Sequence, residues 1–277
     1  MKKLIFIILL LFSFDLYALK GVLITEPEQL NTIPESSTAF GFMPSSLGEI
    51  ENVLEINKGK YTPIINISRY FWNGSKGIFE YYNIEQLKIA FGDNKVILML
   101  DEPFWWIKSA CNEGKWLACN EVKNNYKNTR ELFKRVKFEL NYQLIHIESY
   151  IILIEQKQLG EVKLIESADH VGFDCYSEDF NNCGGYSQLE YASWLYDSML
   201  DHQKIFLIAG SFLSDGFFKM QDIDKINLQL EQTFDLYNNY KNIVSGIGIF
   251  SWGSIDNSII GVYNIPTLKN KIKELLK

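Results

Sequence analysis

The chain has 277 residues, of which 47% are hydrophobic, 22% are charged and 14% are aromatic. This length and composition suit one large folded domain and exclude a disordered chain, because the apolar content is sufficient to bury a core. The formal net charge of −7 argues against nucleic-acid binding, since neutralising phosphates requires a basic face.

The first eighteen residues have the pattern of a secretory signal peptide. Two lysines precede an apolar core from Leu4 to Phe14, and Ala18 supplies the small residue of a cleavage site. This core is shorter than the ~17 residues that a membrane-spanning helix needs. We therefore expect residues 1–18 to be removed and residues 19–277 to form an exported domain, periplasmic or secreted, without a transmembrane segment.

Four cysteines fall into two pairs, and the two positions of each pair differ by eight. The pairs are Cys111 with Cys119 and Cys175 with Cys183. Of the three possible connectivities we favour these two local disulfides, each closing a loop of about nine residues, which contributes about 2.6 kcal/mol in the chain-entropy model. Zinc binding by the four thiolates is the alternative, although no close Cys-x-x-Cys pair is present.

Short apolar runs alternate with longer amphipathic segments along the chain. Strands are predicted at residues 22–24, 39–42, 64–68, 96–101, 144–148, 170–174, 205–209 and 247–252. Helices are predicted at residues 47–57, 84–91, 129–142, 187–202, 222–240 and 267–276, and residues 151–165 suit either a helix or a strand. The alternation predicts an α/β fold, a single-domain (β/α)8 TIM barrel. No Gly-rich phosphate loop follows the first strand, so we expect no nucleotide cofactor.

Alternation along single strands predicts which side chains face the centre of the barrel. We expect the isoleucines of residues 144–148 to face the helices, so that His146 and Glu148 face inward. The same reasoning places Asn66 and Asp174 inside and puts Trp252 at the mouth of the cavity. Barrel enzymes have their active sites at the C-terminal strand ends, so these polar positions predict a site there.

The fourth predicted strand ends in Asp101-Glu102-Pro103, and Trp105 and Trp106 follow. Pro103 ends the strand and holds Glu102 at the rim, while neighbouring rings provide an apolar setting that raises a carboxyl pKa, as a general acid requires. The alternative interpretation is that the two carboxylates cap the next helix and the tryptophans pack a loop.

These residues resemble a family. Asp101-Glu102-Pro103 is similar to the Asn-Glu-Pro signature of the clan of (β/α)8 glycoside hydrolases that includes cellulases and β-galactosidases. Residues 168–176 resemble a later strand of such barrels, and residues 248–252 resemble their closing strand with its sugar-stacking Trp. The resemblance spans residues 19–277. It implies a glycosidase acting on a poly- or oligosaccharide, with Glu102 as the general acid.

The chain departs from that clan at two positions. Asp101 replaces the Asn that contacts the sugar 2-hydroxyl, and residues 205–211 of the seventh strand contain no Glu where the clan has its nucleophile. Asp174 or Glu148 is then the second catalytic carboxylate. Neighbouring strands place carboxyl groups roughly 5 Å apart, the retaining separation, and strands two apart allow the ~6.5–9.5 Å of an inverting pair.

Further residues on this face suit substrate binding. Most of them are aromatic side chains that present flat faces to sugar rings, and Arg69 suits a carboxylate or hydroxyl group. The predicted substrate-binding set is Asp101, Trp72, Trp105, Trp106, His146, Tyr176, Trp252, Asn66 and Arg69. Packing of the aromatic rings and a surface ion pair of Arg69 are the alternative roles.

Two other function classes remain open. A catalytically inactive barrel that binds glycans would keep the aromatic residues and tolerate the missing Glu. A metal-dependent hydrolase would use His146, Glu148, His170 and Asp174 as ligands. Our primary expectation is a monomeric carbohydrate-acting protein with no metal and no cofactor, in which His146 orients a carboxylate.

Overall fold

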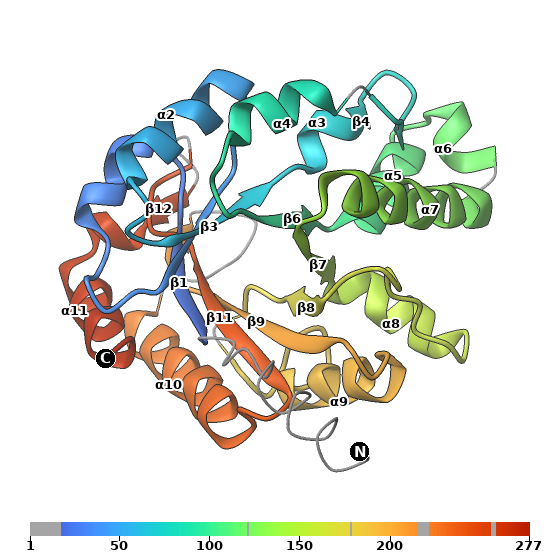
Figure 1. Cartoon of the computed structure of the whole chain (residues 1–277). Coiled ribbons are helices and arrows are strands. Elements are labelled where there is room, and N and C mark those ends of the chain that lie inside the picture. The colour runs from blue at the N-terminus through green and yellow to red at the C-terminus, as the bar shows by residue number, and fades with distance from the viewer. Residues whose placement is uncertain (1–17, 83, 121, 178, 215–221, 256–258) are drawn as a thin grey trace, which may run out of the picture.

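Eight parallel strands close into a barrel (Figure 1). The computed structural model describes residues 18–82, 84–120, 122–177, 179–214, 222–255 and 259–277. The barrel strands, in chain order and in their order around the barrel, are β1 (Leu19–Ile24), β2 (Ala39–Phe42), β3 (Thr62–Asn66), β6 (Ile97–Asp101), β7 (Gln143–Ser149), β8 (His170–Asp174), β9 (Lys204–Gly210) and β11 (Val244–Phe250). The predicted (β/α)8 barrel is confirmed.

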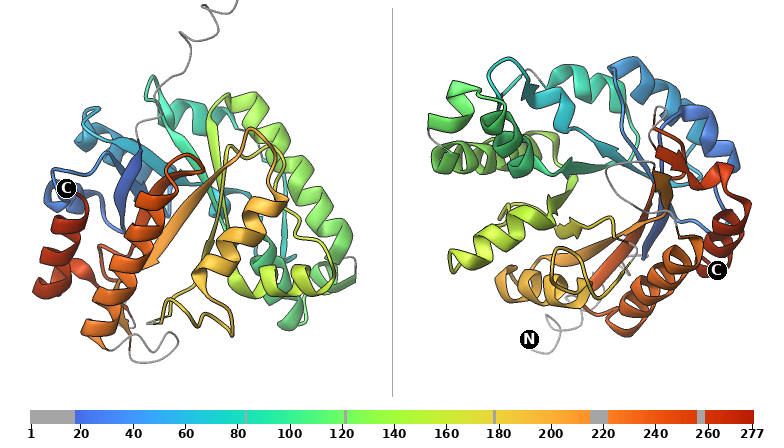
Figure 2. Two further views of the ribbon diagram at one scale, coloured as in Figure 1. Left: turned by 90° about the horizontal axis from the view of Figure 1, so that it is seen from below. Right: turned by 180° about the vertical axis from the view of Figure 1, so that it is seen from behind.

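Helices surround this barrel, as both views of Figure 2 show. The α-helices are α2 (Leu47–Asn57), α3 (Ser68–Phe71), α4 (Glu85–Phe91), α5 (Pro103–Asn112), α6 (Trp116–Asn120), α7 (Val122–Leu140), α8 (Tyr150–Gln158), α9 (Gln188–Ser198), α10 (Ile223–Asn239) and α11 (Pro266–Leu275). The remaining elements are the 3-10 helices η1 (Pro27–Thr32) and η2 (Val262–Asn264) and the antiparallel pairs β4 (Trp72–Asn73) with β5 (Ile78–Phe79) and β10 (Phe212–Ser214) with β12 (Ile259–Gly261).

Several helices begin where a polar side chain satisfies the free backbone N–H groups of the first turn. Asp222 accepts hydrogen bonds from the N–H groups of Asp224 and Lys225, at 3.1 and 3.3 Å, and so starts α10. Ser187 and Glu190 form a reciprocal capping box at the start of α9. Of residues 151–165, which suited either a helix or a strand, the first part up to Gln158 lies in α8, and the rest is neither helix nor strand.

No helix among the described residues is long and apolar enough to span a membrane. Of the predicted signal peptide, residues 1–17 lie outside the described part of the chain. The first strand, β1, starts at Leu19, the residue after the predicted cleavage position at Ala18.

Two hydrophobic cores lie on the two faces of the barrel strands. The larger fills the space between strands and helices. The smaller fills the barrel interior and consists of Leu19, Ala39, Ile64, Ile97, Met99, Ile145, Ile147 and Phe206. Because both faces of a parallel barrel are apolar, a strand side chain finds a hydrophobic environment on either face.

The predicted orientation of β7 is wrong. Ile145 and Ile147 belong to the barrel interior, so His146 and Glu148 face the helix layer. The isoleucines carried no information on the direction, since an isoleucine packs equally well inside the barrel and against a helix. The two polar side chains are accommodated under α5 by hydrogen bonds, as described below.

The predicted orientations of β3 and β8 are confirmed. Ile65 lies in the outer core while Ile64, one position before it, lies in the interior, which puts Asn66 inside. On β8 a Cβ at Gly172 would lie 2.2 Å from the carbonyl oxygen of Phe206, so this position faces the interior and requires glycine. Asp174 therefore also faces the interior.

Candidate active site

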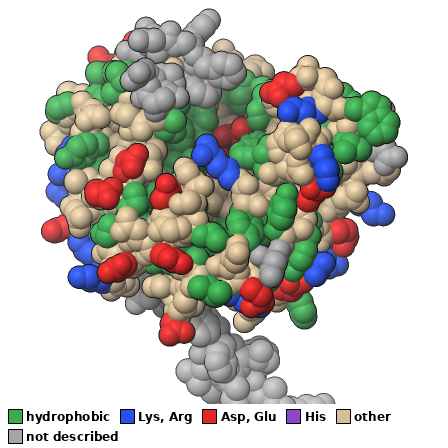
Figure 3. All heavy atoms as spheres, turned by 90° about the horizontal axis from the view of Figure 1, so that it is seen from above, with side chains coloured by type: hydrophobic (Ala, Val, Ile, Leu, Met, Phe, Trp, Pro, Cys, Tyr) green, Lys and Arg blue, Asp and Glu red, His purple; other side chains and the backbone are tan. Residues whose placement is uncertain are grey.

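Four carboxylates gather where β6, β7 and β8 end, at the C-terminal face of the barrel. They are Asp101, Glu102, Glu148 and Asp174. In barrel enzymes this face carries the catalytic residues. Acidic side chains are visible at the bottom of a hollow in the molecular surface, with hydrophobic side chains around it (Figure 3).

The backbone of Glu102 is left-handed, with φ 48° and ψ 47°. A Glu rarely adopts this conformation, and a residue before proline normally is extended. Its N–H donates to the carbonyl oxygen of Ile147 at 2.8 Å, and Pro103 starts α5 at the next position. Strained backbone of this kind is characteristic of functional sites.

The carboxyl group of Glu102 is hydrogen-bonded to that of Asp174. Burial, followed by the charge of Asp174, raises the pKa of Glu102 far above its ordinary value. Burial and the charge of Asp101 also raise the pKa of Asp174. The pair therefore holds a proton at neutral pH, with Glu102 as the donor.

This contact is shorter than the separation that we predicted for strands two apart. A hydrogen bond between carboxyl groups brings two oxygens to about 2.5–3.0 Å, whereas we expected carboxyl groups ~6.5–9.5 Å apart. Glu102 lies one residue beyond the end of β6, where its backbone is left-handed.

Asp101 is the third carboxylate that faces the interior. Its N–H donates to the hydroxyl of Ser68 at 2.9 Å, and the amide of Asn66 donates to its Oδ2 at 3.4 Å. Asp101 also lines a cavity of about 40 Å³ inside the barrel, whose other walls are mostly apolar. Burial and the charge of Glu148 raise the pKa of Asp101 to about 6.

Glu148 has a different environment, since it is 1% exposed and lies beneath the start of α5. Its carboxylate accepts hydrogen bonds from the backbone N–H groups of Phe104 and Trp105, at 3.2 and 3.3 Å, and from the N–H of Ser149 at 2.9 Å. A carboxylate at this position compensates the free donors and the positive end of the helix dipole. Glu148 therefore fixes the helix that follows Glu102.

The two buried histidines do not join the carboxylate cluster as ligands. His146 is buried on the helix side, where its Nδ1 accepts the N–H of Ile165 and its Nε2 lies 3.4 Å from Glu148. It orients that carboxylate, as predicted, but its burial makes the predicted sugar contact wrong. His170 stands at the opposite end of its strand from Asp174, and its Nδ1 lies 2.8 Å from the hydroxyl of Ser245.

Within the described residues no group of three or more His, Cys, Asp or Glu side chains is arranged to hold a metal ion. The ligand set that we considered for a metal-dependent hydrolase is divided between the barrel interior, the helix layer and the opposite end of β8. These four residues therefore do not converge on one metal site.

A groove of about 300 Å³ opens beside Glu102. Its walls include Trp72, Trp105 and Trp106, all partly exposed. The rings of Trp72 and Trp106 pack edge to face with centroids 5.4 Å apart, which fixes their orientation. Trp105 and Trp106 lie on α5 and not on a loop, contrary to our expectation.

Tyr176 covers the barrel interior above Asp174. Its hydroxyl is hydrogen-bonded to Asp174, and burial raises the pKa of this phenol well above its ordinary value. The ring stacks on Phe250 with centroids 4.9 Å apart and meets Phe212 edge to face. These contacts hold Tyr176 in place, so it forms a fixed wall of the site.

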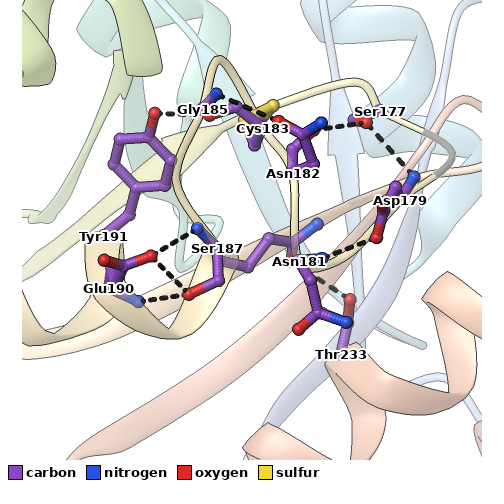
Figure 4. Close-up of a disulfide and its surroundings, with 12 residues drawn as sticks. Ser177, Asp179, Asn181, Asn182, Cys183, Gly185, Ser187, Glu190, Tyr191 and Thr233 are labelled. Carbon is purple, nitrogen blue, oxygen red and sulfur yellow. Dashed lines mark hydrogen bonds between the residues drawn. A yellow bond between two sulfur atoms is a disulfide. The ribbon is translucent and has the colours of Figure 1, made fainter.

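A disulfide stabilises the segment that carries Tyr176. Cys175, the residue between Asp174 and Tyr176, is bonded to Cys183, whose carbonyl accepts a hydrogen bond from the hydroxyl of Tyr191 at 2.7 Å (Figure 4). The second disulfide joins Cys111 and Cys119 at the end of α5. Both predicted local pairings are confirmed, and the zinc alternative for the four cysteines is wrong.

The predicted position of Trp252 is wrong. The side chain is 0% exposed, and its indole N–H donates to the hydroxyl of Thr32 at 3.0 Å. The residue belongs to the core between the barrel and the outer elements and has no free face for a sugar ring. The ring at the end of the last barrel strand that does border the interior is Phe250.

The seventh barrel strand, β9, ends without a carboxylate. Ser211 follows it and is fully buried, with its N–H donating to the carbonyl oxygen of Phe250 at 2.6 Å. Arg69 and Asn66 line a third cavity, of about 330 Å³, near the ends of β2 and β3. The structure thus brings together Asp101, Glu102 and Asp174, and places Glu148 directly behind them.

The sequence analysis did not identify the supporting aromatic residues Phe79, Phe212 and Phe250. Phe79 packs against both Trp72 and Trp106, with centroids 4.9 and 6.0 Å apart. A helix directly after Glu102 was considered only in the alternative interpretation, although Pro103 is a preferred first residue of a helix. That proline was the available signal.

Solved structures with a similar fold include glycoside hydrolases. A GH113 β-1,4-mannanase matches with a TM-score of 0.57 and 12% identity, over 94% of this chain and 98% of its own. A β-glucosidase from Exiguobacterium marinum matches with a TM-score of 0.55 and 10% identity, over 90% of this chain and 85% of its own. An endo-β-1,4-xylanase from Gloeophyllum trabeum matches with a TM-score of 0.51 and 10% identity, over 94% of this chain and 96% of its own.

This chain has the barrel fold of those glycoside hydrolases. The resemblance seen in the sequence is confirmed at the level of the fold. No family model matches the sequence, and no curated protein matches it.

Proposed function

We propose that this chain is an exported glycoside hydrolase-like protein that acts on a poly- or oligosaccharide. Glu102 is the general acid and Asp174 is the second carboxylate. The observation that carries this proposal is the hydrogen-bonded pair of carboxyl groups beside the tryptophan-lined groove. An acid next to flat aromatic faces is the arrangement that glycosidic cleavage requires.

Glu102 suits the acid role because it keeps its proton at neutral pH. A general acid must be protonated before it can donate to the leaving oxygen. Glu102 is also the member of the pair that lines the groove, so a saccharide lying on Trp72 and Trp106 would pass beside it. Trp105, on the same helix, extends that surface.

Asp174 suits the second role better than Glu148. Both oxygens of Glu148 already accept backbone N–H groups, so a reaction at this carboxylate would expose the unpaired donors of α5. Asp174 faces the interior and contacts Glu102 and the hydroxyl of Tyr176. We assign Glu148 a positioning role through α5.

Hydrolysis requires the carboxyl pair to open. A nucleophilic partner stands roughly 5–5.5 Å from the acid, and a base that activates water stands ~6.5–9.5 Å from it. A hydrogen-bonded pair leaves no space for a sugar carbon or a water molecule. In this proposal a bound saccharide takes the proton of Glu102 and displaces it from Asp174.

The test is release of reducing ends from β-1,4-mannan, xylan and β-1,4-glucan, since the structures with a similar fold include a β-1,4-mannanase and an endo-β-1,4-xylanase. Glu102→Gln should lower turnover about 10²–10⁴-fold, the usual contribution of a general acid. Glu131→Gln, an exposed change on α7, is the matched control and should retain activity. Full turnover by Glu102→Gln would exclude Glu102 as the acid.

A catalytically inactive glycan-binding barrel is the second candidate function. Two observations favour it: Ser211 follows the seventh strand where a carboxylate would be expected, and the carboxyl pair is closed. The same panel separates the two functions. Retention on a polysaccharide without release of reducing ends supports binding alone, and release supports hydrolysis.

Export and a monomeric state are the remaining parts of the proposal. The signal peptide pattern at residues 1–18 and two disulfides support export, because disulfides persist in oxidising compartments. Fractionation of cells that produce the full chain tests export. Light scattering on the purified protein tests the monomer.

A further inference from the structure

The cavity near the ends of β2 and β3 has the features of a binding site for an acidic sugar. Its volume of about 330 Å³ lies within the range of small-molecule sites. Ile50, Ile67 and Leu87 provide apolar walls, and Tyr70 adds an aromatic one. A sugar ring presents apolar C–H faces to such walls and hydroxyl groups to the polar residues around them.

Arg69 is the cationic side chain among the residues lining this cavity. It is exposed, and it makes no ion pair with any residue in the described part of the chain. Its guanidinium attracts Asp101 without an ion pair between them. A guanidinium binds a carboxylate with two parallel hydrogen bonds, so this side chain is available for an anionic ligand.

Other charged side chains lie near the groove and the cavity. Glu102 and Glu113 line the tryptophan groove, and the ammonium of Lys115 there donates to the carbonyl of Gly74 at 2.6 Å. Glu49 accepts the N–H of Ser45 at 2.7 Å at the start of α2. Arg69 therefore supplies the positive charge beside this cavity, whereas in the groove the positive charge of Lys115 is accompanied by Glu113.

Asn66 connects this cavity with the carboxylate cluster. It lines the cavity, and its amide donates to Asp101 at 3.4 Å, one residue before Glu102. A saccharide crossing the mouth of the barrel would place one unit near Arg69 and another near the tryptophans. The sugar unit near Arg69 would then be selected for a negative charge.

We propose that this cavity binds a uronic acid unit through a carboxylate–Arg69 pair. The inference rests on the proposed action on saccharides and specifies its substrate class. It predicts that removing the charge of the sugar, and not its ring, weakens binding.

The experiment compares D-glucuronate and D-galacturonate with their uncharged methyl esters by NMR titration of the folded protein. We expect the wild type to bind a uronate roughly tenfold to a hundredfold more tightly than its ester, the usual effect of hydrogen bonds to a charged group. Arg69→Gln should reduce this ratio to about one, and Arg69→Lys should keep only part of it. Arg135→Gln, an exposed change on α7, is the matched control and should retain the ratio.

The outcomes separate this inference from the proposed function. Equal binding of acid and ester by the wild type, an unchanged ratio in Arg69→Gln, or no uronate binding overturns the uronic acid site. If any of these results is found and the protein still releases reducing ends from a neutral polysaccharide, the hydrolase proposal stays intact. Uronate binding that depends on Arg69 without any hydrolysis supports the site and contradicts the hydrolase.

Discussion

The carboxyl group of Glu102 is hydrogen-bonded to that of Asp174, although β7 lies between the two strands that carry them. Glu102 has a left-handed backbone, and burial raises the pKa of both carboxyl groups. The same contact explains why Glu102 is a suitable acid and why the closed pair is not yet a hydrolytic arrangement. Several measurable properties depend on it.

The carboxylate pair should make the protein less stable at alkaline pH. The pKa of Asp174 is raised in the folded state, so the folded protein keeps a proton that the unfolded chain loses above about pH 4. This contribution is fully present below that pH and is lost as the pH rises through the folded-state pKa. Asp174→Asn should therefore raise the melting temperature at pH 9 relative to wild type, with a smaller gain at pH 5.

A change of about 1 kcal/mol in the free energy of unfolding shifts the melting temperature of a domain of this size by ~2–4 °C. Thermal unfolding at pH 5, 7 and 9 measures it. Asp235→Asn, an exposed change on α10, is the control and should shift the melting temperature equally at all three values. A gain for Asp174→Asn that does not depend on pH would contradict the raised pKa.

His170 should make the protein less stable at acidic pH, whereas the carboxyl pair makes it less stable at alkaline pH. Burial lowers its pKa to about 4, so the folded state disfavours the proton that the unfolded chain binds below about pH 6.5. This contribution is present above pH 6.5 and is lost as the pH falls toward 4. His170→Gln should make the free energy of unfolding fall less steeply over this interval.

Urea unfolding at pH 7 and pH 4.5 checks this prediction. The exposed His202 is the matched position, and His202→Gln should retain the slope of the wild type. If His170→Gln loses stability on acidification as steeply as the wild type does, another group is responsible.

Glu148 should stabilise the protein through the start of α5. Glu148→Ala leaves the buried N–H groups of Phe104 and Trp105 without an acceptor, which costs roughly 1–3 kcal/mol for each unsatisfied group. Glu148→Gln keeps one acceptor oxygen and should cost less. Urea unfolding gives both free energies.

Glu49 offers a matched comparison, since its carboxylate accepts the N–H of Ser45 at the solvent-exposed start of α2. Water can replace that carboxylate, so Glu49→Ala should cost less than about 1 kcal/mol. Similar losses for Glu49→Ala and Glu148→Ala would show that burial of the acceptor has no special importance.

The two disulfides should contribute unequally even though they close loops of the same length. The chain-entropy contribution is about 2.6 kcal/mol for each. Cys183 is fully buried and Cys119 is exposed, so replacing Cys175 and Cys183 by serine also places a hydroxyl in the core. The Cys175/Cys183 double variant should therefore lose more free energy of unfolding than the Cys111/Cys119 double variant. Equal losses would leave chain entropy as the sole contribution.

The eight strands were predictable because each is a short apolar run between amphipathic segments. On β3 and β8 the alternation of apolar residues gave the correct orientation, since Ile65, Val171 and Phe173 lie in the outer core. On β7 the isoleucines fitted either side, so His146 and Glu148 were assigned to the wrong face. Periodicity cannot resolve a strand that is buried on both faces.

The distances in the site were not predictable. Strand spacing gave the separation expected between Glu102 and Asp174, but the backbone conformation at Glu102 determines the real contact. Trp252 was assigned to the mouth of the barrel because the last strand was predicted to continue to residue 252, yet β11 ends at Phe250 and the ring is buried. Side-chain direction after a strand end depends on local backbone conformation, which residue identity did not reveal.

The central claim is that Glu102 donates a proton to a saccharide held in the tryptophan groove. A crystal structure of the Glu102→Gln variant with an oligosaccharide from the hydrolysed polysaccharide tests it most directly. The account predicts a glycosidic oxygen within about 3.2 Å of the side chain at position 102, sugar rings on Trp72 or Trp106, and the side chains at positions 102 and 174 moved apart. A saccharide bound elsewhere, with these two side chains still in contact, would contradict it.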